Sequence, residues 1–198
     1  ITKPALLAGT ALAGIVAVKG FTRLKDIDSA KTKLEALGHS AAAVDSIMQD
    51  AIKSVKGTAY ALNEAATTAA GAVAAGVKPG AELEGYLSSV ADAAAVAGVS
   101  MEEMGSIFNR TQTAGRAYAM ELNMLADRGI PIYQWIAEEA KISAGEVRKF
   151  AADGKVSSEI YFNAIKKNIG GAAKEIGEKS FTGALQNIWA SVARIGEN

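Results

Sequence analysis

Residues 125–167, LADRGIPIYQWIAEEAKISAGEVRKFAADGKVSSEIYFNAIKK, decide the fold of this chain. Their apolar side chains recur at the spacing of a helix, and no alternating strand pattern competes with it. Gly129 and Gly154 each follow a periodic run, at the place where a left-handed residue ends a helix. Pro131 stands where a first helical turn tolerates a missing N–H group. The stretch therefore predicts several short helices instead of one long helix or a sheet.

The same pattern extends outward from this stretch in both directions. Ser100 with Glu103 and Ser143 with Glu146 have the spacing of a capping box, in which each side chain satisfies a free amide of the other residue. Ser40 is a further N-cap candidate. Helical apolar stripes occupy residues 44–55, 83–97 and 185–195, and further boundaries fall at Gly38, Pro79, Gly98 and the pair Gly170 and Gly171. The sequence predicts an all-α fold, a compact bundle of many short helices broken by glycine and proline, with no sheet.

Composition divides the chain into three parts. Of its 198 residues 49% are hydrophobic, which is enough to bury a core. We expect an apolar helical head over residues 1–20, an Ala/Gly-rich helical subdomain over 21–115, and an aromatic-cored helical subdomain over 116–198. In the second part the small residues permit close approach of helices. In the third part five aromatic residues come close together in the sequence and predict the main core of that subdomain: Tyr133, Trp135, Phe150, Tyr161 and Phe162.

The head is apolar without interruption from Ala5 to Val18 and is flanked by Lys3 and Lys19. As a helix it would reach roughly 21 Å, short of the ~30 Å hydrocarbon core of a bilayer. The sequence leaves two interpretations open: a helix that packs on the core or on a partner, and a segment that inserts in a membrane. The first and last residues of the chain also suggest a fragment of a longer protein.

The residues for most enzyme chemistry are absent from the sequence. There is no cysteine, and the single histidine, His39, lies at a predicted helix junction, so thiol and histidine-based metal or triad chemistry lack their ligands. No phosphate-binding glycine motif or nucleophile elbow is present. Adjacent carboxylates at 102–103 and 138–139 point about 100° apart on a helix and cannot flank one bond. We predict no enzyme activity, no cofactor and no metal.

Charge is balanced overall, with 21 basic and 21 acidic residues, so no specific nucleic-acid site is indicated. Its distribution is nonetheless uneven, because the start of the chain is basic. The candidate contact surface consists of Arg23, Lys25, Lys31 and Lys33, together with the exposed sides of the small-residue helices. The methionines, among them Met101, Met104, Met120 and Met124, are interpreted as adaptable core residues, with a partner groove as the alternative.

The stretch 125–167 resembles the tape-measure domain of long-tailed bacteriophages and related prophage tails. The resemblance lies in an ordered set of motifs: the RGIPIY turn, the S-x-G-E-V-R-K cap, the DGKVS turn and the apolar helix that follows. It extends upstream through FTRLKDIDSAKTKLEALGHS and SVKGTAYALNEAATTAAGAVAAGVKPG, and downstream to FTGALQNIWASVARIG. It therefore covers nearly everything after residue 20, whereas the head is only generically similar.

The resemblance implies a virion structural protein that acts as a ruler in the lumen of the tail tube, helps to set tail length during assembly and leaves during genome ejection. It implies synthesis in the bacterial host cytoplasm and contacts with tail-tube proteins, tail-tip proteins, tail-assembly chaperones and other copies of itself. The rival interpretation is a membrane-active segment that inserts in the host envelope during ejection. No peptidoglycan-cleaving signature occurs in the chain. Because glycine and proline interrupt the helices so often, we expect a compact module and not the measuring rod itself.

Overall fold

The computed structural model describes residues 22–180, and the predicted head and the apolar stripe at 185–195 lie outside this part. Within it, helices alternate with short turns, and the only extended pairing is an isolated antiparallel bridge between Arg116 and Ser157. The all-α prediction is confirmed. The helices are 22–36, α2 (Ala41–Val55), α3 (Leu62–Ala74), α4 (Ala81–Ala97), α5 (Met101–Ala114), α6 (Ala119–Ala126), α7 (Ile132–Ala140), α8 (Val147–Ala152), α9 (Ser158–Ile169) and 172–180.

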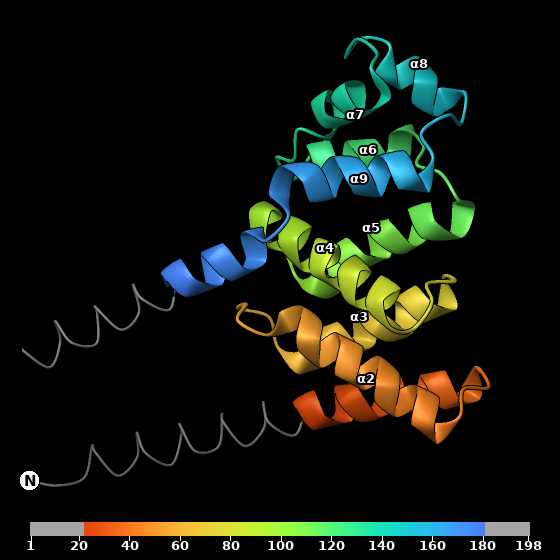
Figure 1. The fold of residues 1–198 in the computed structure, drawn as a ribbon, viewed down its shortest axis with the longest axis vertical. Coiled ribbons are helices and arrows are strands. Elements are labelled where there is room, and N and C mark those ends of the chain that lie inside the picture. Colours follow the sequence, from red (N-terminus) through yellow and green to blue (C-terminus); the bar gives the residue numbers. More distant parts are fainter. Residues whose placement is uncertain (1–21, 181–198) are drawn as a thin grey trace, which may run out of the picture.

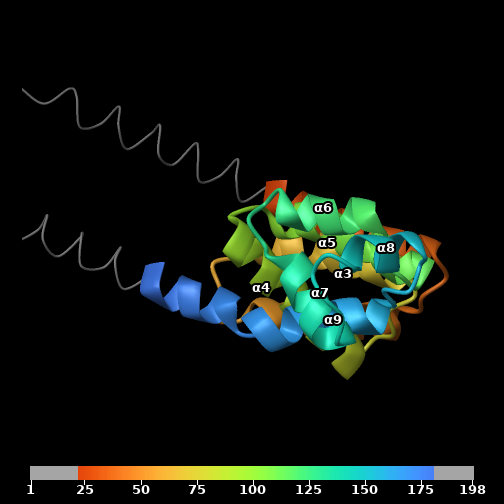
Figure 2. The same ribbon diagram turned by 90° about the horizontal axis from the view of Figure 1, so that it is seen from above.

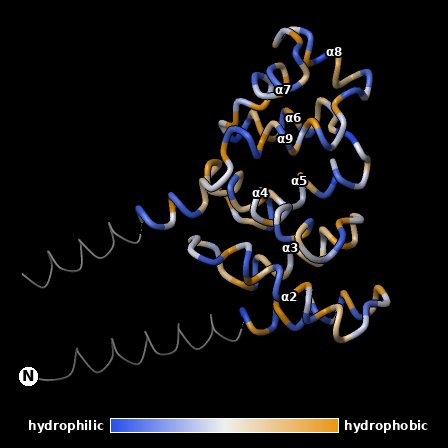
Figure 3. Tube along the Cα trace, viewed as in Figure 1, coloured by the Kyte–Doolittle hydropathy of each residue, from blue (hydrophilic) through white to orange (hydrophobic). Residues whose placement is uncertain are grey.

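The helices are arranged in layers along one long axis (Figure 1). Helix 22–36 and α2 form one end, α3, α4 and α5 form the middle, and α6 and α9 lead to α7 and α8 at the other end. α3 packs on both α2 and α5, and α4 touches α2, α5 and α9. In Figure 3 hydrophobic and hydrophilic residues alternate along the helices, as expected for helices that each bury one face.

Several predicted helix boundaries are present in the structure. The hydroxyls of Ser40 and Ser100 accept hydrogen bonds from the amides of Ala43, at 3.3 Å, and Glu103, at 3.1 Å. Gly129 and Gly154 have φ angles of +80° and +68°, the left-handed conformation that glycine adopts without steric cost. These local signals end the helices where the sequence places the breaks.

The two predicted capping boxes are each only half formed. The Glu103 carboxylate turns away from Ser100 and binds Arg128 instead. In the other box the amide and hydroxyl of Ser143 both donate to the Glu146 carboxylate, at 2.9 and 2.6 Å, but α8 begins only after Glu146. Ser143 therefore closes the turn before α8 and does not cap that helix.

Three carboxylates accept hydrogen bonds from the start of a helix that lies later in the chain, and we call them the cross-helix caps. Asp50 of α2 accepts from the Gly80 amide at 2.7 Å, and Glu64 of α3 accepts from the Met101 amide at 3.3 Å. Asp92 of α4 accepts from the amides of Gly171 and Ala173, both at 2.9 Å. Because the first amides of a helix have no partner within it, these carboxylates fix where α4, α5 and helix 172–180 begin.

The apolar core runs through all the layers. The predicted stripes at 44–55 and 83–97 are buried except at their edges, where Ile52 is 40% exposed and Ala97 is half-buried. Met101 and Met104 are fully buried, as the interpretation of core methionines predicts, whereas Met120 is 52% exposed. The core is therefore built mainly from the predicted faces of the helices.

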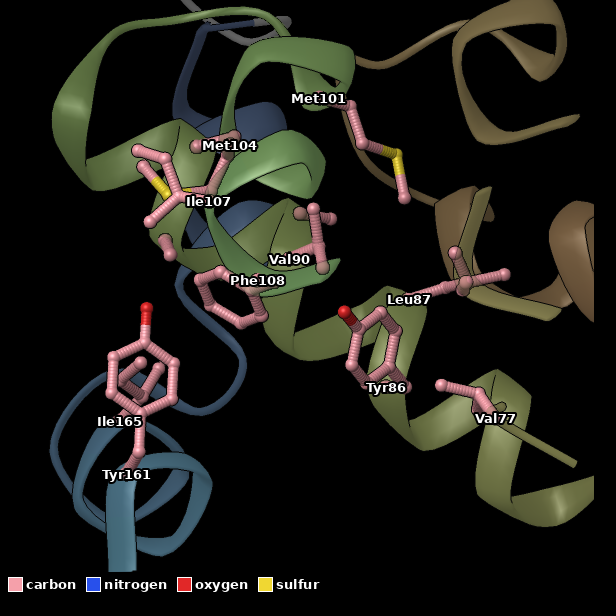
Figure 4. Close-up of a cluster of buried hydrophobic side chains, with 14 of the residues drawn as sticks. Val77, Tyr86, Leu87, Val90, Met101, Met104, Ile107, Phe108, Tyr161 and Ile165 are labelled. Carbon is pink, nitrogen blue, oxygen red and sulfur yellow. The ribbon is translucent and has the colours of Figure 1, made fainter. Parts of the chain in front are cut away.

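The aromatic core differs from the predicted cluster in its membership. Tyr161 and Phe162 of α9 pack against Phe108 of α5 with ring centroids 5.6 Å apart in both pairs, and Tyr86 of α4 is 5.3 Å from Phe162. Figure 4 shows Tyr86, Phe108 and Tyr161 converging from three helices. The other three predicted members, Tyr133, Trp135 and Phe150, are only half-buried around this core. The division at residue 115 into two subdomains stays a prediction.

Candidate contact surfaces

A groove lies between α3 and α5 and ends at the start of α6, and we call it the α3/α5 groove. Its walls carry mostly small side chains, and its far end carries larger ones. Met120 and Tyr118 at that end are 52% and 43% exposed. The lining residues are Thr67, Thr68, Gly71, Ala74, Ala75, Glu102, Gly105, Ser106, Asn109, Arg110, Thr113, Ala114, Tyr118, Met120 and Glu121.

Two glycines let α3 and α5 approach closely at the floor of this groove. A Cβ atom added at Gly105 would lie 2.6 Å from Thr68 Cγ2, and one added at Gly71 would lie 2.7 Å from Asn109 Nδ2. Real Cβ atoms are not found so close to a neighbour, so a larger residue at Gly105 would press on the short Thr68 side chain of α3. At Gly71 the Asn109 amide group, whose oxygen accepts from Tyr86, would have to move. The small residues predicted for tight helix packing in residues 21–115 thus include Gly71, and Gly105 of α5 serves the same packing.

Acidic side chains gather at the near end of the groove. Partial burial, reinforced by the Glu64 and Asp26 carboxylates, raises the pKa of Glu102, although a hydrogen bond from Thr67 works in the opposite direction. Asp26 accepts a hydrogen bond from Asn63 at 3.1 Å, and Glu64 caps α5. Lys33 lines the adjoining hollow with Asp26 and Glu102, but within residues 22–180 none of the three carboxylates forms a salt bridge. Three carboxylates beside one lysine leave this end with an excess of negative charge.

The basic residues of helix 22–36 do not form one patch. Arg23, Lys25 and Lys33 are exposed and Lys31 is half-buried. Lys25 and Lys31 line one shallow hollow with Leu24 and Ile27, while Lys33 lines another with Asp26 and Glu102. Their role in partner contacts stays a prediction, and any contact would involve different sides of the helix.

The other residues considered for chemistry are dispersed. His39 lies half-buried in the turn after helix 22–36. Glu103 pairs with Arg128 at 2.7 Å whereas Glu102 faces the groove, so adjacent carboxylates point apart as expected on a helix. Glu139 lies 3.9 Å from Lys167, and Glu138 is exposed. The described residues contain no group of three metal-ligating side chains.

The hydroxyl groups of two tyrosines connect segments of the chain. The Tyr86 hydroxyl donates to Asn109 at 2.8 Å, which ties α4 to α5, and the Tyr60 hydroxyl donates to the Val99 carbonyl at 3.1 Å. Burial, with a smaller effect of Glu64, raises the pKa of Tyr60 to about 12. Both hydroxyls thus stay protonated and hold segments together. Nothing local in the sequence indicates that Tyr60 has a partner 39 residues away.

One family match covers the features described above for residues 22–180, including the small-residue packing, the helix breaks and the turn motifs. Residues 19–198 match the family described as tape measure protein. The chain belongs to the tape measure protein family. No curated protein and no solved structure shows a significant match to it. The tape-measure match begins at residue 19, so most of the apolar head lies before it.

Family membership gives the tape-measure segment a structural role in a phage tail. No helix among residues 22–180 is both long and apolar enough to cross a membrane.

Proposed function

We propose that this segment is a compact docking module of a phage tail tape-measure protein, which contributes to tail assembly and length determination through protein contacts and later to genome ejection. The match to the family over residues 19–198 is the observation that carries this proposal. The partners we infer are tail-tube and tail-tip proteins, tail-assembly chaperones and further copies of the chain. The location we infer is the lumen of the tail tube, after synthesis in the host cytoplasm.

The dimensions of the helices support a module and not a rod. A single helix over residues 22–180 would be about 240 Å long at about 1.5 Å per residue. The longest helix with defined caps, α4, has 17 residues and is therefore about 26 Å long. The cross-helix caps join helices that are far apart in sequence, which favours the layered arrangement over an extended one. We infer that measurement of length belongs to other parts of a tape-measure protein.

A deletion in a phage distinguishes a role in docking from a role in length measurement. In a phage that carries this segment, removal of residues 22–180 should greatly reduce the yield of infectious tails, because a docking module is lost. Any tails that form should keep their normal length in electron micrographs. A deletion of equal length in a long heptad-like helix of the same protein is the control and should shorten the tail. Normal infectious tails, or tails shortened in proportion to the deleted residues, would contradict the proposal.

The inferred contacts are open to direct measurement with the purified chain. We expect binding to tail-tube protein or to a tail-assembly chaperone in calorimetry, and light scattering gives the oligomeric state. Reversal of the exposed charges, Arg23→Glu with Lys25→Glu, should weaken binding if the basic helix takes part, while Lys149→Glu on the distant α8 serves as the control. Equal affinities for both variants would remove helix 22–36 from the interface.

A second candidate function is membrane activity of the head during ejection. The observation that favours it is the apolar run from residue 5 to residue 18, which contains no charged residue. Liposome leakage caused by residues 1–198 but not by residues 22–198 would support insertion. Absence of leakage with both proteins would exclude this function.

A further inference from the structure

The α3/α5 groove is continuous with a second hollow beside helix 22–36. That hollow is lined by Asp26, Ser29, Ala30 and Lys33 of this helix, and it shares Thr67 and Glu102 with the groove. Asp26 also accepts a hydrogen bond from Asn63, one turn before Thr67 on α3. The first described residue, one turn before Asp26, therefore lies near the acidic end of the groove, where the chain from the apolar head arrives.

The groove and the head have matching lengths. The groove follows α5 from Glu102 to Ala114, which is about 18 Å at about 1.5 Å per residue. The apolar run 5–18 would form a helix of about 21 Å. A reversal at Lys19 and Gly20 is short enough for an antiparallel helical hairpin, and glycine is suited to such a turn. A helix that reverses there can lie along the whole groove.

The lining of the groove also suits this occupant. Thr67, Ala74, Ser106 and Ala114 are exposed in the groove and have small side chains. Such a surface accepts a helix at short distance, and the head offers larger apolar side chains to fill it, such as Leu12 and Ile15. The exposed Met120 marks the far end, where the leucines at the start of the head would arrive.

Charge supports the direction of binding. The near end of the groove carries Asp26, Glu64 and Glu102 without a salt bridge in residues 22–180, and Lys19 directly follows the apolar run. A basic residue there would relieve the repulsion among the three carboxylates. Helix 172–180 starts at Asp92 of α4 and lies on the side of α4 and α9 (Figure 2).

We propose that residues 5–18 bind in the α3/α5 groove of the same chain as a helix antiparallel to α5, with the chain reversing at Lys19 and Gly20 and Lys19 facing Glu102. The head then completes the layer formed by α3 and α5, and its apolar surface is covered by its own module.

Disulfide crosslinking tests this arrangement, because the natural chain has no cysteine. Ser106→Cys is combined in turn with Leu12→Cys, Ala13→Cys, Gly14→Cys and Ile15→Cys in the chain 1–198. If Val18 lies beside Glu102, these four positions cover one helical turn opposite Ser106, so at least one comes within the Cα distance of about 5.5 Å that a disulfide needs. We expect that variant to form an intramolecular disulfide in most molecules under mild oxidation.

The control pairs the same four head positions with Ser46→Cys, which is exposed on α2 and outside the groove, and it should give no intramolecular disulfide. Failure of all four Ser106→Cys pairs would overturn the proposal. Disulfides formed only between two chains would also overturn it, because a second copy would then be the occupant.

A second measurement does not depend on introduced cysteines. Ser106→Trp fills the groove and should make tryptic cleavage after Lys19 about tenfold faster, because the displaced head leaves Lys19 accessible. Ser46→Trp places the same side chain on α2 and should leave the rate unchanged. Equal cleavage rates in the two variants and the natural chain would contradict binding of the head in the groove.

Discussion

The middle helices, α2–α5, and the later helices, α6–α9, are held together in different ways. α3 and α5 pack through small residues, with Gly71 and Gly105 at contacts where a Cβ atom would not fit. The starts of α4 and α5 are held by the cross-helix caps of Asp50 and Glu64. The later helices are shorter, 6 residues in α8 and 9 in α7, and large half-buried rings such as Tyr133 and Trp135 cover them. The middle region depends on glycines, which have no Cβ atom, and the later region depends on large aromatic side chains.

Individual helices also differ in how far along the sequence their cap lies. In α9 the hydroxyl of Ser157 accepts from the Ile160 amide at 3.2 Å, so the cap lies next to its helix in the sequence. The cap of α4 comes from Asp50, 30 residues earlier. A local cap stabilises one helix, whereas a cross-helix cap also fixes the position of one helix against another. We therefore expect substitutions in the middle region to loosen tertiary structure, and those at local caps to affect single helices.

The aromatic contact between the two regions should show the largest effect. Phe108→Ala removes a fully buried ring that packs on Tyr161 and Phe162, and we expect a loss of about 3–5 kcal/mol in the free energy of unfolding. Urea unfolding followed by circular dichroism measures it. Phe150→Ala, at a half-buried ring, should cost clearly less, and equal losses would show that Phe108 does not join the regions.

Removal of a cross-helix cap should have the next largest effect. Asp92→Ala leaves the amides of Gly171 and Ala173 without their acceptor, and we expect a loss of about 2–3 kcal/mol. Asp92→Asn keeps one oxygen acceptor and should lose less. Hydrogen exchange should accelerate at residues 171–180 before the rest of the chain. Uniform acceleration throughout the molecule would contradict a specific role of Asp92 in placing helix 172–180.

A matched pair of glycines tests the small-residue packing. Gly105→Ala introduces a Cβ atom 2.6 Å from Thr68 Cγ2 and should cost about 1–2 kcal/mol of unfolding free energy. Gly85→Ala, in the interior of α4 where a Cβ atom meets nothing within 4 Å, should instead stabilise the protein by about 0.5–1 kcal/mol. Thermal unfolding shows whether each substitution stabilises or destabilises the protein. The same sign at both positions would mean that close approach of α3 and α5 does not matter.

A local cap should show the smallest effect. Ser157→Ala removes the hydroxyl acceptor at the start of α9, and we expect a loss of about 1 kcal/mol. Ser143→Ala should cost less, because the amide of Ser143 still binds the exposed Glu146 carboxylate. A loss at Ser157 as large as that at Asp92 would remove the distinction between local and cross-helix caps.

The parts of the candidate site that follow local rules could be predicted. Small residues near Gly71 predicted a close helix contact, and the neighbouring carboxylates at 102 and 103 were expected to diverge. The α3/α5 groove itself could not be predicted, because it depends on two helices 26 residues apart meeting at one angle. The close contact at Gly105 could not be predicted, because the sequence does not show whether a glycine in a helix faces solvent or a neighbouring helix.

The sequence by itself determined the helices. Periodic apolar residues set which faces are buried, and Ser40, Ser100, Gly129 and Gly154 end or begin helices through contacts with their near neighbours. The tertiary structure alone decided which helices meet. Asp50 and Asp92 form their hydrogen bonds with residues 30 and 79 positions away, and the aromatic core unites α4, α5 and α9 instead of the aromatics that are close in sequence. Such contacts depend on how whole helices pack, and no local pattern specifies that packing.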